Sequence, residues 1–361
     1  MEKEKIKLAI VGTQGIPNQY GGFEALAEHI AKHLSNQFEI TVFCSSIVYD
    51  KKLPESYGCK LKYLPLKANG IQSVVYDIIS ILKSVRIYDK ILILGASGGI
   101  ILPLLKRYKK KFILNFGGLD WKRSKWGRFA KVYLKLSEAL SVKNCAVLIS
   151  DNAAIQQYIK QEYNKESILV EYGGDQISRE TIDEGDVKKY PFLNQRYALS
   201  VARIQPDNNI EMIFEAFNNA SLPLVFIGNW NTSKYGNNLK ARFGNQGNII
   251  LLDAIYEQKE LNKIRSNCSL YIHGHSAGGT NPSLVEAMNL GLPIFCYASG
   301  FNENTTEYKA FYFNSKTQLH KLVETIDEIE LQRLRNEMKL IAERRYKWNL
   351  IAEKYAACFN N

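Results

Sequence analysis

The sequence has 361 residues, of which 46% are hydrophobic and 23% are charged, and its formal net charge is +11. This length favours two domains that each bury their own core, and the composition excludes a disordered or collagen-like chain. The six cysteines include no C-x-x-C pair, which argues against a zinc site or a disulfide framework and favours a reducing cytosol. No signal peptide or membrane span is expected, because the N-terminus leads directly into a strand and no apolar run approaches the ~20 residues of a span.

The first half of the chain alternates apolar strands with segments of helical period. Residues 5–12, K-I-K-L-A-I-V-G, form an apolar run that ends in glycine, as is typical of a parallel strand buried on both faces. Further strands are expected at 40–44, 60–65, 90–94, 112–116, 147–150 and 167–171, and helices at 25–34, 72–84 and 155–162. This alternation predicts a parallel sheet with helices on both faces.

Loops rich in glycine or polar residues follow these strands, at 13–24, 95–99, 117–120, 151–152 and 172–175. Because open parallel sheets bind ligands at the carboxyl ends of their strands, we expect these loops to share one cleft. The first loop, T-Q-G-I-P-N-Q-Y-G-G-F-E, contains Gly15, which suits close approach of the backbone to a ligand. The loop lacks the G-x-G-x-x-G spacing, although a hydride-transfer cofactor there stays an alternative.

A strongly basic segment spans residues 106–143. It contains twelve Lys or Arg residues and two acidic ones, a balance of +10 that attracts an acidic partner. Its apolar residues recur every three or four positions and predict an amphipathic helix, at Trp126, Phe129, Tyr133, Leu136 and Leu140. Such a helix suits an anionic membrane surface. The alternatives are that the stripe packs on its own domain, or that the segment binds nucleic acid, which is not expected because no nucleic-acid-binding motif accompanies the charge.

The alternation of strands and helices restarts after a charged segment at 178–195, which is interpreted as a linker. Strands are expected at 197–201, 224–227, 249–252 and 269–272, and helices at 210–217, 237–243 and 256–266. The pattern predicts a second α/β domain at 196–340, after a first domain at 1–178. Residues 341–361 have helical spacing and predict a closing helix.

The most informative stretch is residues 273–291, H-G-H-S-A-G-G-T-N-P-S-L-V-E-A-M-N-L-G. It follows an apolar strand and predicts a loop of small residues and then a helix, with Asn281 as N-cap and Pro282 in the first turn. Such a helix start offers unpaired N–H groups and a positive dipole end to a phosphate or diphosphate. Glu286, one turn into the helix, is suited to accept hydrogen bonds from ribose hydroxyls. The alternative is an ordinary turn followed by a solvated glutamate.

Four motifs resemble one family of enzymes: G-T-Q-G-I-P-N-Q-Y-G-G-F-E, D-W-K-R-S-K-W, V-A-R-I-Q-P-D-N-N-I and H-G-H-S-A-G-G-T-N-P-S-L-V-E-A-M. They resemble the rhamnosyltransferase-like branch of the retaining GT-B glycosyltransferases, of glycosyltransferase family 4 type, which build capsule and cell-wall polysaccharides. The resemblance covers nearly the whole chain. It implies a GT-B fold, in which two Rossmann-like, doubly wound parallel-sheet domains face a central cleft. The first would bind the acceptor, the second the nucleotide sugar, and the C-terminal helix would return toward the first.

The resemblance also implies roles for single residues. Glu286 matches the second glutamate of the family's Glu-x7-Glu motif and is expected at the ribose, whereas the first glutamate falls on Gly278. Arg203 matches the arginine of an Arg-x4-Lys pair that grips the diphosphate, whereas the lysine falls on Asn208. The branch carries an Asp-Gly pair where this chain has Gly117-Gly118, so Asp120 or Asp151 is the nearest substitute for that acid.

The expected site combines these assignments. The catalytic candidates are Arg203, Asp151, Tyr172 and Asp120. The candidates for binding the nucleotide sugar are Gly15, Arg203, Asn208, Gly278, Gly279, Thr280, Asn281, Ser283 and Glu286. The candidates for contact with the membrane or acceptor are Trp121, Lys122, Arg123, Lys125, Trp126 and Arg128. No metal is expected, because no D-x-D motif is present and helix N–H groups with Arg203 would stabilise the leaving diphosphate.

The expected function is that of a peripheral enzyme on the inner face of the bacterial plasma membrane. It would transfer a sugar, best interpreted as L-rhamnose from dTDP-rhamnose, to a lipid-diphosphate-linked saccharide, with no cofactor beyond the donor. A UDP- or GDP-sugar is the alternative donor. Outside this class, the alternatives are a cytosolic nucleotide-dependent oxidoreductase and a non-catalytic protein that binds nucleotide sugars or nucleic acid.

Overall fold

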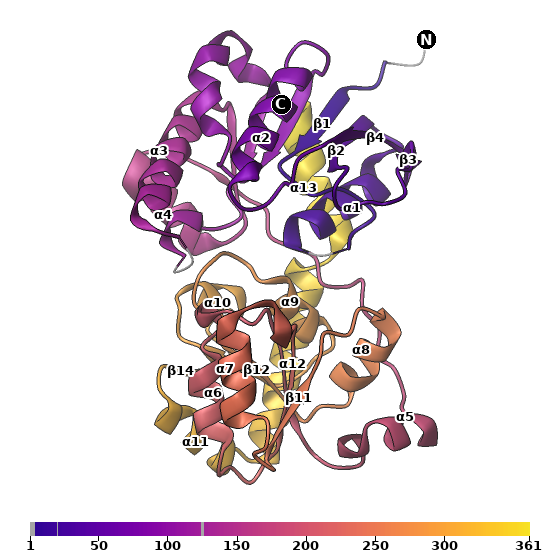
Figure 1. Cartoon of the computed structure of the whole chain (residues 1–361), viewed down its shortest axis with the longest axis vertical. Coiled ribbons are helices and arrows are strands. Elements are labelled where there is room, and N and C mark those ends of the chain that lie inside the picture. Colours follow the sequence, from indigo (N-terminus) through magenta and orange to yellow (C-terminus); the bar gives the residue numbers. More distant parts are fainter. Residues whose placement is uncertain (1–3, 20, 124–125) are drawn as a thin grey trace. The chain divides into compact units, whose positions relative to one another are not determined.

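The computed structural model describes residues 4–19, 21–123 and 126–361, which form two compact units (Figure 1). The first unit consists of the chain up to Tyr172 together with Trp348–Asn361, and the second is Gly173–Lys347. Each unit is built on one mainly parallel sheet with helical connections. The predicted class, two doubly wound α/β domains, is confirmed.

The first unit contains an eight-stranded sheet in the order β3-β4-β2-β1-β5-β6-β7-β8. Every pairing is parallel except that between β3 and β4. The strands are β1 (Lys7–Val11), β2 (Glu39–Ser45), β3 (Glu55–Ser56), β4 (Cys59–Leu64), β5 (Lys90–Leu94), β6 (Phe112–Asn115), β7 (Val147–Ser150) and β8 (Ile168–Leu169). The helices are α1 (Gly22–Leu34), α2 (Gln72–Ser84), η1 (Gly99–Lys111), η2 (Asp120–Lys122), α3 (Arg128–Asn144), α4 (Ala153–Tyr163) and α13 (Trp348–Asn360).

The second unit contains a six-stranded, wholly parallel sheet in the order β11-β10-β9-β12-β13-β14. The strands are β9 (Ala198–Val201), β10 (Leu224–Ile227), β11 (Ile249–Leu252), β12 (Leu270–His273), β13 (Ile294–Tyr297) and β14 (Phe311–Phe313). The helices are α5 (Glu184–Lys189), η3 (Pro191–Asn194), η4 (Pro206–Asn208), α6 (Ile210–Phe217), η5 (Trp230–Thr232), α7 (Lys234–Phe243), α8 (Gln258–Ser266), α9 (Pro282–Asn289), α10 (Phe301–Thr305), α11 (Lys316–Thr325) and α12 (Glu328–Arg345).

The core of the second unit gathers around Trp230, which is fully buried. Its indole N–H donates to the backbone oxygen of Leu252 at 2.8 Å. The indole also lies against the rings of Phe214 and Phe226, with centroids 6.0 and 5.5 Å away. Burying such large aromatic side chains supplies much of the free energy that holds the sheet and its helices together.

The interpretation of residues 178–195 as a linker is wrong. This segment contains α5, whose first turn is closed by reciprocal hydrogen bonds between Asp183 and Asp186. The Asp186 carboxylate lies 2.6 Å from the ammonium group of Lys263, and the Tyr190 hydroxyl donates to Glu260, both on α8. The charges that suggested a solvated linker therefore anchor the segment to the second unit, and the division of the chain falls after Tyr172 rather than after residue 178.

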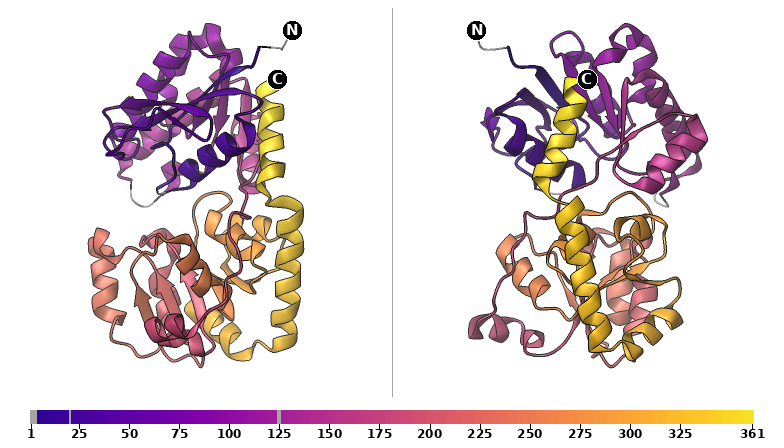
Figure 2. Two further views of the ribbon diagram at one scale, coloured as in Figure 1. Left: turned by 90° about the vertical axis from the view of Figure 1, so that its right-hand side faces the viewer. Right: turned by 180° about the vertical axis from the view of Figure 1, so that it is seen from behind.

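The closing segment forms α12 and α13, and α13 belongs to the first unit. There it packs against α1, as Figure 2 shows. Phe359 is fully buried and lies edge-on to Phe38, and the ammonium group of Lys354 lies 2.9 Å from the Glu171 carboxylate. Within the described part of the chain, no helix is both long and apolar enough to span a bilayer.

Candidate functional site

The candidate site in the second unit lies where the strand order of its sheet reverses. β9 pairs with β10 on one side and with β12 on the other, and all three strands run parallel. The loops after β9 (202–209) and β12 (274–281) therefore leave the same edge of the sheet as neighbours. Such a reversal point is where open parallel sheets bind ligands. Most of the predicted nucleotide-sugar residues lie on these two loops or on the helix that follows.

Hydrogen bonds join the two loops to each other. Nδ1 of His275 lies 2.8 Å from Oδ1 of Asn208, and the side chain of Asn209 donates to the backbone oxygen of Gly274 at 2.8 Å. A Cβ atom on Gly274 would lie 2.2 Å from the backbone oxygen of Asn208, so only glycine permits this approach. The loops therefore form one structural element.

Asn208 is a buried contact between these loops. Both polar atoms of its side chain have partners. Nδ2 donates to the backbone oxygen of Arg203 at 2.6 Å, and Oδ1 lies 2.8 Å from Nδ1 of His275. The family resemblance puts a diphosphate-binding lysine at this position. The asparagine supplies no charge there, but it fixes the backbone that carries Arg203.

Arg203 directly follows β9, and its side chain is exposed. Among the described residues, no carboxylate forms an ion pair with its guanidinium group. Its backbone oxygen is fixed by Asn208 and also accepts a hydrogen bond from the backbone N–H of Gln205 at 2.9 Å. A fixed backbone with a free guanidinium group suits bidentate binding of a diphosphate.

The helix α9 begins as predicted from the sequence. Asn281 is the N-cap, and its side-chain oxygen accepts hydrogen bonds from the backbone N–H and the hydroxyl of Ser283, at 3.0 and 2.9 Å. Pro282 occupies the first helical position. The positive end of the α9 dipole therefore lies at this first turn, next to the loop that precedes it.

The loop before α9 is tightly packed, with Gly278, Gly279 and Thr280 all buried. Gly278 has φ of +140°, and a Cβ atom there would lie 2.9 Å from Nε2 of His275. A glutamate at this position, as in the family motif, would be strained in this loop. Burial lowers the pKa of His273, at the end of β12, to about 3, so this imidazole is neutral and offers a diphosphate no charge.

Glu286 is not a freely solvated helix residue, which excludes that alternative. Its Oε2 lies 2.9 Å from Nη2 of Arg265, and its Oε1 accepts a hydrogen bond from the side chain of Gln176 at 2.7 Å. Arg265, on α8, is 2% exposed, and its Nε and Nη1 have no hydrogen-bond partner in the described structure. The carboxylate is therefore held in one orientation, and each oxygen keeps a lone pair for a ligand hydroxyl.

In the first unit the strand order reverses between β1 and β5, and Gly15 lies on the loop after β1. Gly15 has φ of +126°, and a Cβ atom there would lie 2.6 Å from the sulfur of Cys44 on β2. Nearby, the buried carboxylate of Glu24 accepts hydrogen bonds from the Gln14 backbone and the Thr13 hydroxyl, at 2.8 and 3.1 Å. Close packing against β2, and not only a ligand, therefore requires glycine at position 15.

Asp151 and Tyr172 lie close together at the carboxyl edge of the same sheet, after β7 and β8. Both are buried, at 2% and 4% exposed. Burial, together with the neighbouring Asp151 carboxylate, raises the pKa of the Tyr172 hydroxyl well above its ordinary value. The tyrosine is therefore a neutral hydrogen-bond donor beside a carboxylate. Its ring meets Trp348, on α13, edge-on.

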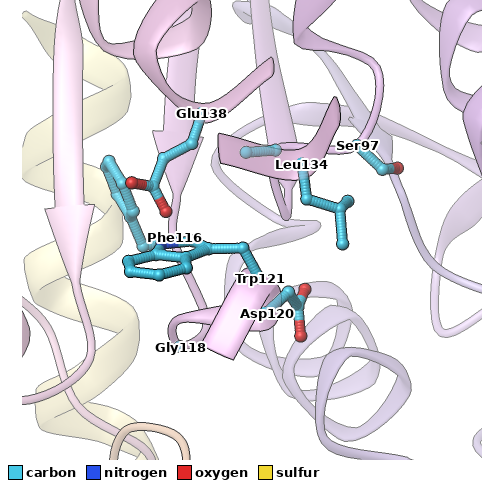
Figure 3. Close-up of a pocket in the computed structure, with 8 residues that line it drawn as sticks. Ser97, Phe116, Gly118, Asp120, Trp121, Leu134 and Glu138 are labelled. Atoms are coloured by element: carbon cyan, nitrogen blue, oxygen red, sulfur yellow. The ribbon is translucent and has the colours of Figure 1, made fainter. Parts of the chain in front are cut away.

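Asp120 lies elsewhere, in a pocket formed by the ends of β5 and β6, η2 and α3 (Figure 3). The pocket is lined by Ala96, Ser97, Phe116, Gly118, Asp120, Trp121, Leu134 and Glu138. In Figure 3 the Trp121 ring extends toward Glu138 and away from the Asp120 carboxylate. The indole N–H of Trp121 has no hydrogen-bond partner among the described residues. The free volume of the pocket is about 10 Å³, which is room for one water molecule, so its side chains would have to move before a sugar could enter.

The structure also accounts for the glycine at 117. Gly117 has φ of +57°, and a Cβ atom there would lie 2.2 Å from the ring of Phe23. An aspartate, as in the related branch, would require Phe23 to move. Asp120 is not a free carboxylate that could replace this aspartate, because Oδ1 of Asp120 lies 2.9 Å from Nε of Arg123.

The predicted membrane or acceptor residues surround this pocket or begin α3. The ammonium group of Lys122 lies 5.4 Å from the Trp121 ring centre, and that of Lys135 lies 4.9 Å from it. Trp126 is half-buried and Arg128 is exposed at the start of α3. Lys125 lies outside the described residues.

The comparison with protein families decides the class of the second unit. Residues 183–348 match the family Glycosyl transferases group 1, and residues 5–175 match a Domain of unknown function (DUF1972). The second unit therefore carries a glycosyltransferase domain. No curated protein sequence matches the chain.

Solved structures with the GT-B fold match the chain along nearly its whole length. Sucrose-phosphate synthase from Thermosynechococcus elongatus has a TM-score of 0.81 at 13% identity and covers 99% of this chain and 98% of its own. Anabaena HepE in complex with UDP-glucose has a TM-score of 0.73 at 14% identity, with coverage of 98% and 99%. An Escherichia coli structure titled as trehalose-6-phosphate bound with UDP-2-fluoro glucose has a TM-score of 0.71 at 11% identity, with coverage of 98% and 98%. At these identities the similarity establishes the fold.

Two side chains of the candidate site, Arg265 and Gln176, were not predicted from the sequence. Arg265 occupies the last turn of α8, where a cation is ordinarily solvent-facing and favoured by the helix dipole. Gln176 belongs to the irregular segment after Tyr172. No local signal links either residue to Glu286, which follows 110 residues after Gln176.

We predict that the stability of the protein depends on pH through Asp77, on α2. This carboxyl group is buried against the hydroxyl of Ser97, and burial raises its pKa to about 7. As pH rises from about 4 to about 7, unfolded chains lose this proton while folded ones keep it, so stability falls by up to about 1.4 kcal/mol per pH unit. Asp77→Asn should lose less stability than the wild type between pH 5 and pH 8 in urea unfolding. Equal losses in the two proteins would contradict the prediction.

Proposed function

We propose that the protein is a glycosyltransferase that uses a nucleotide sugar as donor and binds its diphosphate between Arg203 and the N-terminus of α9. The observation that carries this proposal is the joined pair of loops at the reversal point of the second sheet. One loop has a fixed backbone and carries the unpaired guanidinium group of Arg203. The other loop leads into α9 through its N-cap, Asn281. Two proteins of the same fold support it, because their structures are titled as complexes with UDP-glucose and UDP-2-fluoro glucose.

In this mechanism the bond between the sugar's anomeric carbon and the diphosphate oxygen breaks as negative charge develops on the diphosphate. Arg203 and the N–H groups of α9 stabilise that charge without a metal. Glu286, oriented by Arg265 and Gln176, accepts a hydrogen bond from the nucleotide's own sugar, which in a dTDP-sugar is a deoxyribose with a single free hydroxyl, the 3′-hydroxyl. The acceptor oxygen forms the new bond to the anomeric carbon and gives up its proton to the departing diphosphate oxygen. The family resemblance supports a retained anomeric configuration.

We further propose that the sugar is L-rhamnose from dTDP-rhamnose and that the acceptor is a lipid-diphosphate-linked saccharide in capsule or cell-wall synthesis. The motif resemblance supports the donor and the pathway class. The pocket at Trp121 and Asp120 would have to open to admit a saccharide acceptor, and its aromatic ring and polar groups would then suit one. An acceptor with a lipid anchor stays in the membrane, so the enzyme would work at its inner face.

Release of nucleotide from a panel of dTDP-, UDP- and GDP-sugars tests this proposal, with and without a prenyl-diphosphate-linked GlcNAc acceptor in detergent. We expect release from dTDP-rhamnose that rises when the acceptor is added. Release from a UDP- or GDP-sugar instead would show that the donor is not dTDP-rhamnose, while still identifying a glycosyltransferase. Binding of nucleotide without release from any donor or acceptor would favour a non-catalytic binding protein.

A further inference from the structure

Several large apolar side chains of α3 are exposed, while polar side chains on its other face are buried. Phe129, Val132 and Leu136 are 94%, 69% and 51% exposed, and their spacing of three and four puts them on one face. The opposite face, against the first unit, carries Ser137 and Ser141, which are 0% and 1% exposed. Of the predicted stripe, Phe129 and Leu136 are therefore exposed to water, whereas Trp126, Tyr133 and Leu140 are half-buried.

Close packing explains why the polar face of α3 points inward. A Cβ atom on Gly99, at the start of η1, would lie 2.0 Å from the hydroxyl of Ser141 and 2.2 Å from the backbone oxygen of Ser137. Only small side chains permit this approach. The predicted stripe is corrected at Tyr133, which is half-buried and donates its hydroxyl hydrogen to the backbone oxygen of Ser97 at 2.8 Å.

The neighbouring element η1 adds exposed apolar surface. It packs against α3, and its residues Ile100 and Leu104 are 41% and 80% exposed. Two contacting elements of one unit thus leave five large apolar side chains in water. Isolated exposed apolar residues are normal, but such a grouping marks a surface that meets another apolar phase. We call these five residues, on α3 and η1, the apolar face.

Unneutralised cations flank the apolar face. Among the described residues, no carboxylate pairs with any of five nearby cations, Lys106, Arg107, Lys110, Arg128 and Lys131. The two acidic residues of the same segment are occupied, because Asp120 pairs with Arg123 and buried Glu138 accepts from the Tyr158 hydroxyl at 2.6 Å. The surface therefore keeps its positive charge.

We propose that the apolar face docks on an anionic lipid bilayer. Phe129, Val132 and Leu136 enter the boundary between headgroups and acyl chains while the flanking cations contact acidic headgroups. Charge complementarity selects this partner. Nucleic acid would use the cations but gain little from exposed valine and leucine, and a protein interface would be depleted of lysine around its apolar centre.

This surface goes beyond the proposed sugar transfer and does not depend on the identity of the donor. It has a consequence for the acceptor, since Leu134 and Glu138 of α3 also line the Trp121 pocket. One helix thus contributes to both the docking surface and the candidate acceptor pocket. A saccharide attached to a lipid would reach that pocket while the lipid stays in the bilayer.

Co-sedimentation of the full chain with lipid vesicles tests the proposal. We expect binding to phosphatidylglycerol–phosphatidylcholine vesicles, weak binding to pure phosphatidylcholine, and loss of binding between about 0.1 M and about 0.5 M salt. The variant Phe129→Ser/Val132→Ser/Leu136→Ser should bind acidic vesicles at least about tenfold more weakly. Lys106→Glu/Arg107→Glu/Lys110→Glu should bind about 100-fold more weakly.

Matched variants in the second unit serve as controls. Ile329→Ser/Leu340→Ser removes side chains that are 80% and 62% exposed, and Lys188→Glu/Lys240→Glu/Lys259→Glu reverses three exposed cations. Both should keep wild-type vesicle affinity. The serine variant should also keep wild-type thermal stability, because its sites are exposed. Unchanged vesicle binding by the serine variant, equal losses in the controls, or binding to RNA but not to acidic vesicles would overturn the proposal.

Discussion

Arg203→Ala is expected to lower kcat roughly 10²–10³-fold, the usual loss when one preorganised donor to a developing negative charge is removed. The stability of the fold should hardly change, because the side chain is exposed and makes no ion pair with a described carboxylate. Only its backbone oxygen is bonded to Asn208, and alanine keeps that oxygen. The measurements are kcat and KM with the identified donor, together with the thermal midpoint of unfolding.

A matched control is Arg196→Ala, which removes another exposed arginine of the second unit, 3.7 Å from Glu328. It should leave both kcat and the midpoint nearly unchanged. Arg203→Lys should retain part of the activity, because a lysine supplies the charge but not the bidentate geometry. Wild-type turnover in Arg203→Ala would remove this residue from the mechanism. A large drop in its midpoint would assign it a structural role instead.

The parts of the site that could be predicted from the sequence are those encoded by short-range signals. The start of α9 is one example, since Asn281 and Pro282 specify a cap and a first turn by their own chemistry. The strand β1 is another, because a continuous apolar run ending in glycine indicates a strand buried on both faces. These signals need no knowledge of distant residues.

The parts that could not be predicted depend on contacts between distant residues. The pairing of Arg265 with Glu286 arises only when α8 and α9 pack in the same unit. The inward orientation of Ser137 depends on the close approach of Gly99, which no helical period reveals. Composition also misleads where charges pair with one another, as at α5, whose charged residues bind α8.

The identity of Asn208 illustrates both cases. The family resemblance implies a lysine that binds the diphosphate at this position. It does not imply what an asparagine does there. The structure shows a buried side chain that joins the backbone oxygen of Arg203 to the ring of His275. In this chain the Asn208 side chain fixes the backbone that carries Arg203.

Asn208→Leu is therefore expected to weaken both the fold and nucleotide binding. Leucine keeps a similar volume but removes the hydrogen bonds to the Arg203 oxygen and the His275 ring, at a cost of about 1–3 kcal/mol in the free energy of unfolding. The loop that carries Arg203 then loses one of its attachments to the loop before α9, while the bond from Asn209 to Gly274 remains. Urea unfolding measures the first effect, and titration calorimetry with the nucleoside diphosphate measures the second.

Asn248→Leu separates these two effects. The Asn248 side chain also donates to backbone oxygens, at 2.7 Å to Phe217 and 2.9 Å to Ala220, but within another part of the second unit. This variant should lose comparable stability and keep wild-type nucleotide affinity. If Asn208→Leu also kept that affinity, the attachment between the loops would be structural only. If both variants lost affinity equally, general destabilisation would explain the result, and Asn208 would have no specific role in orienting Arg203.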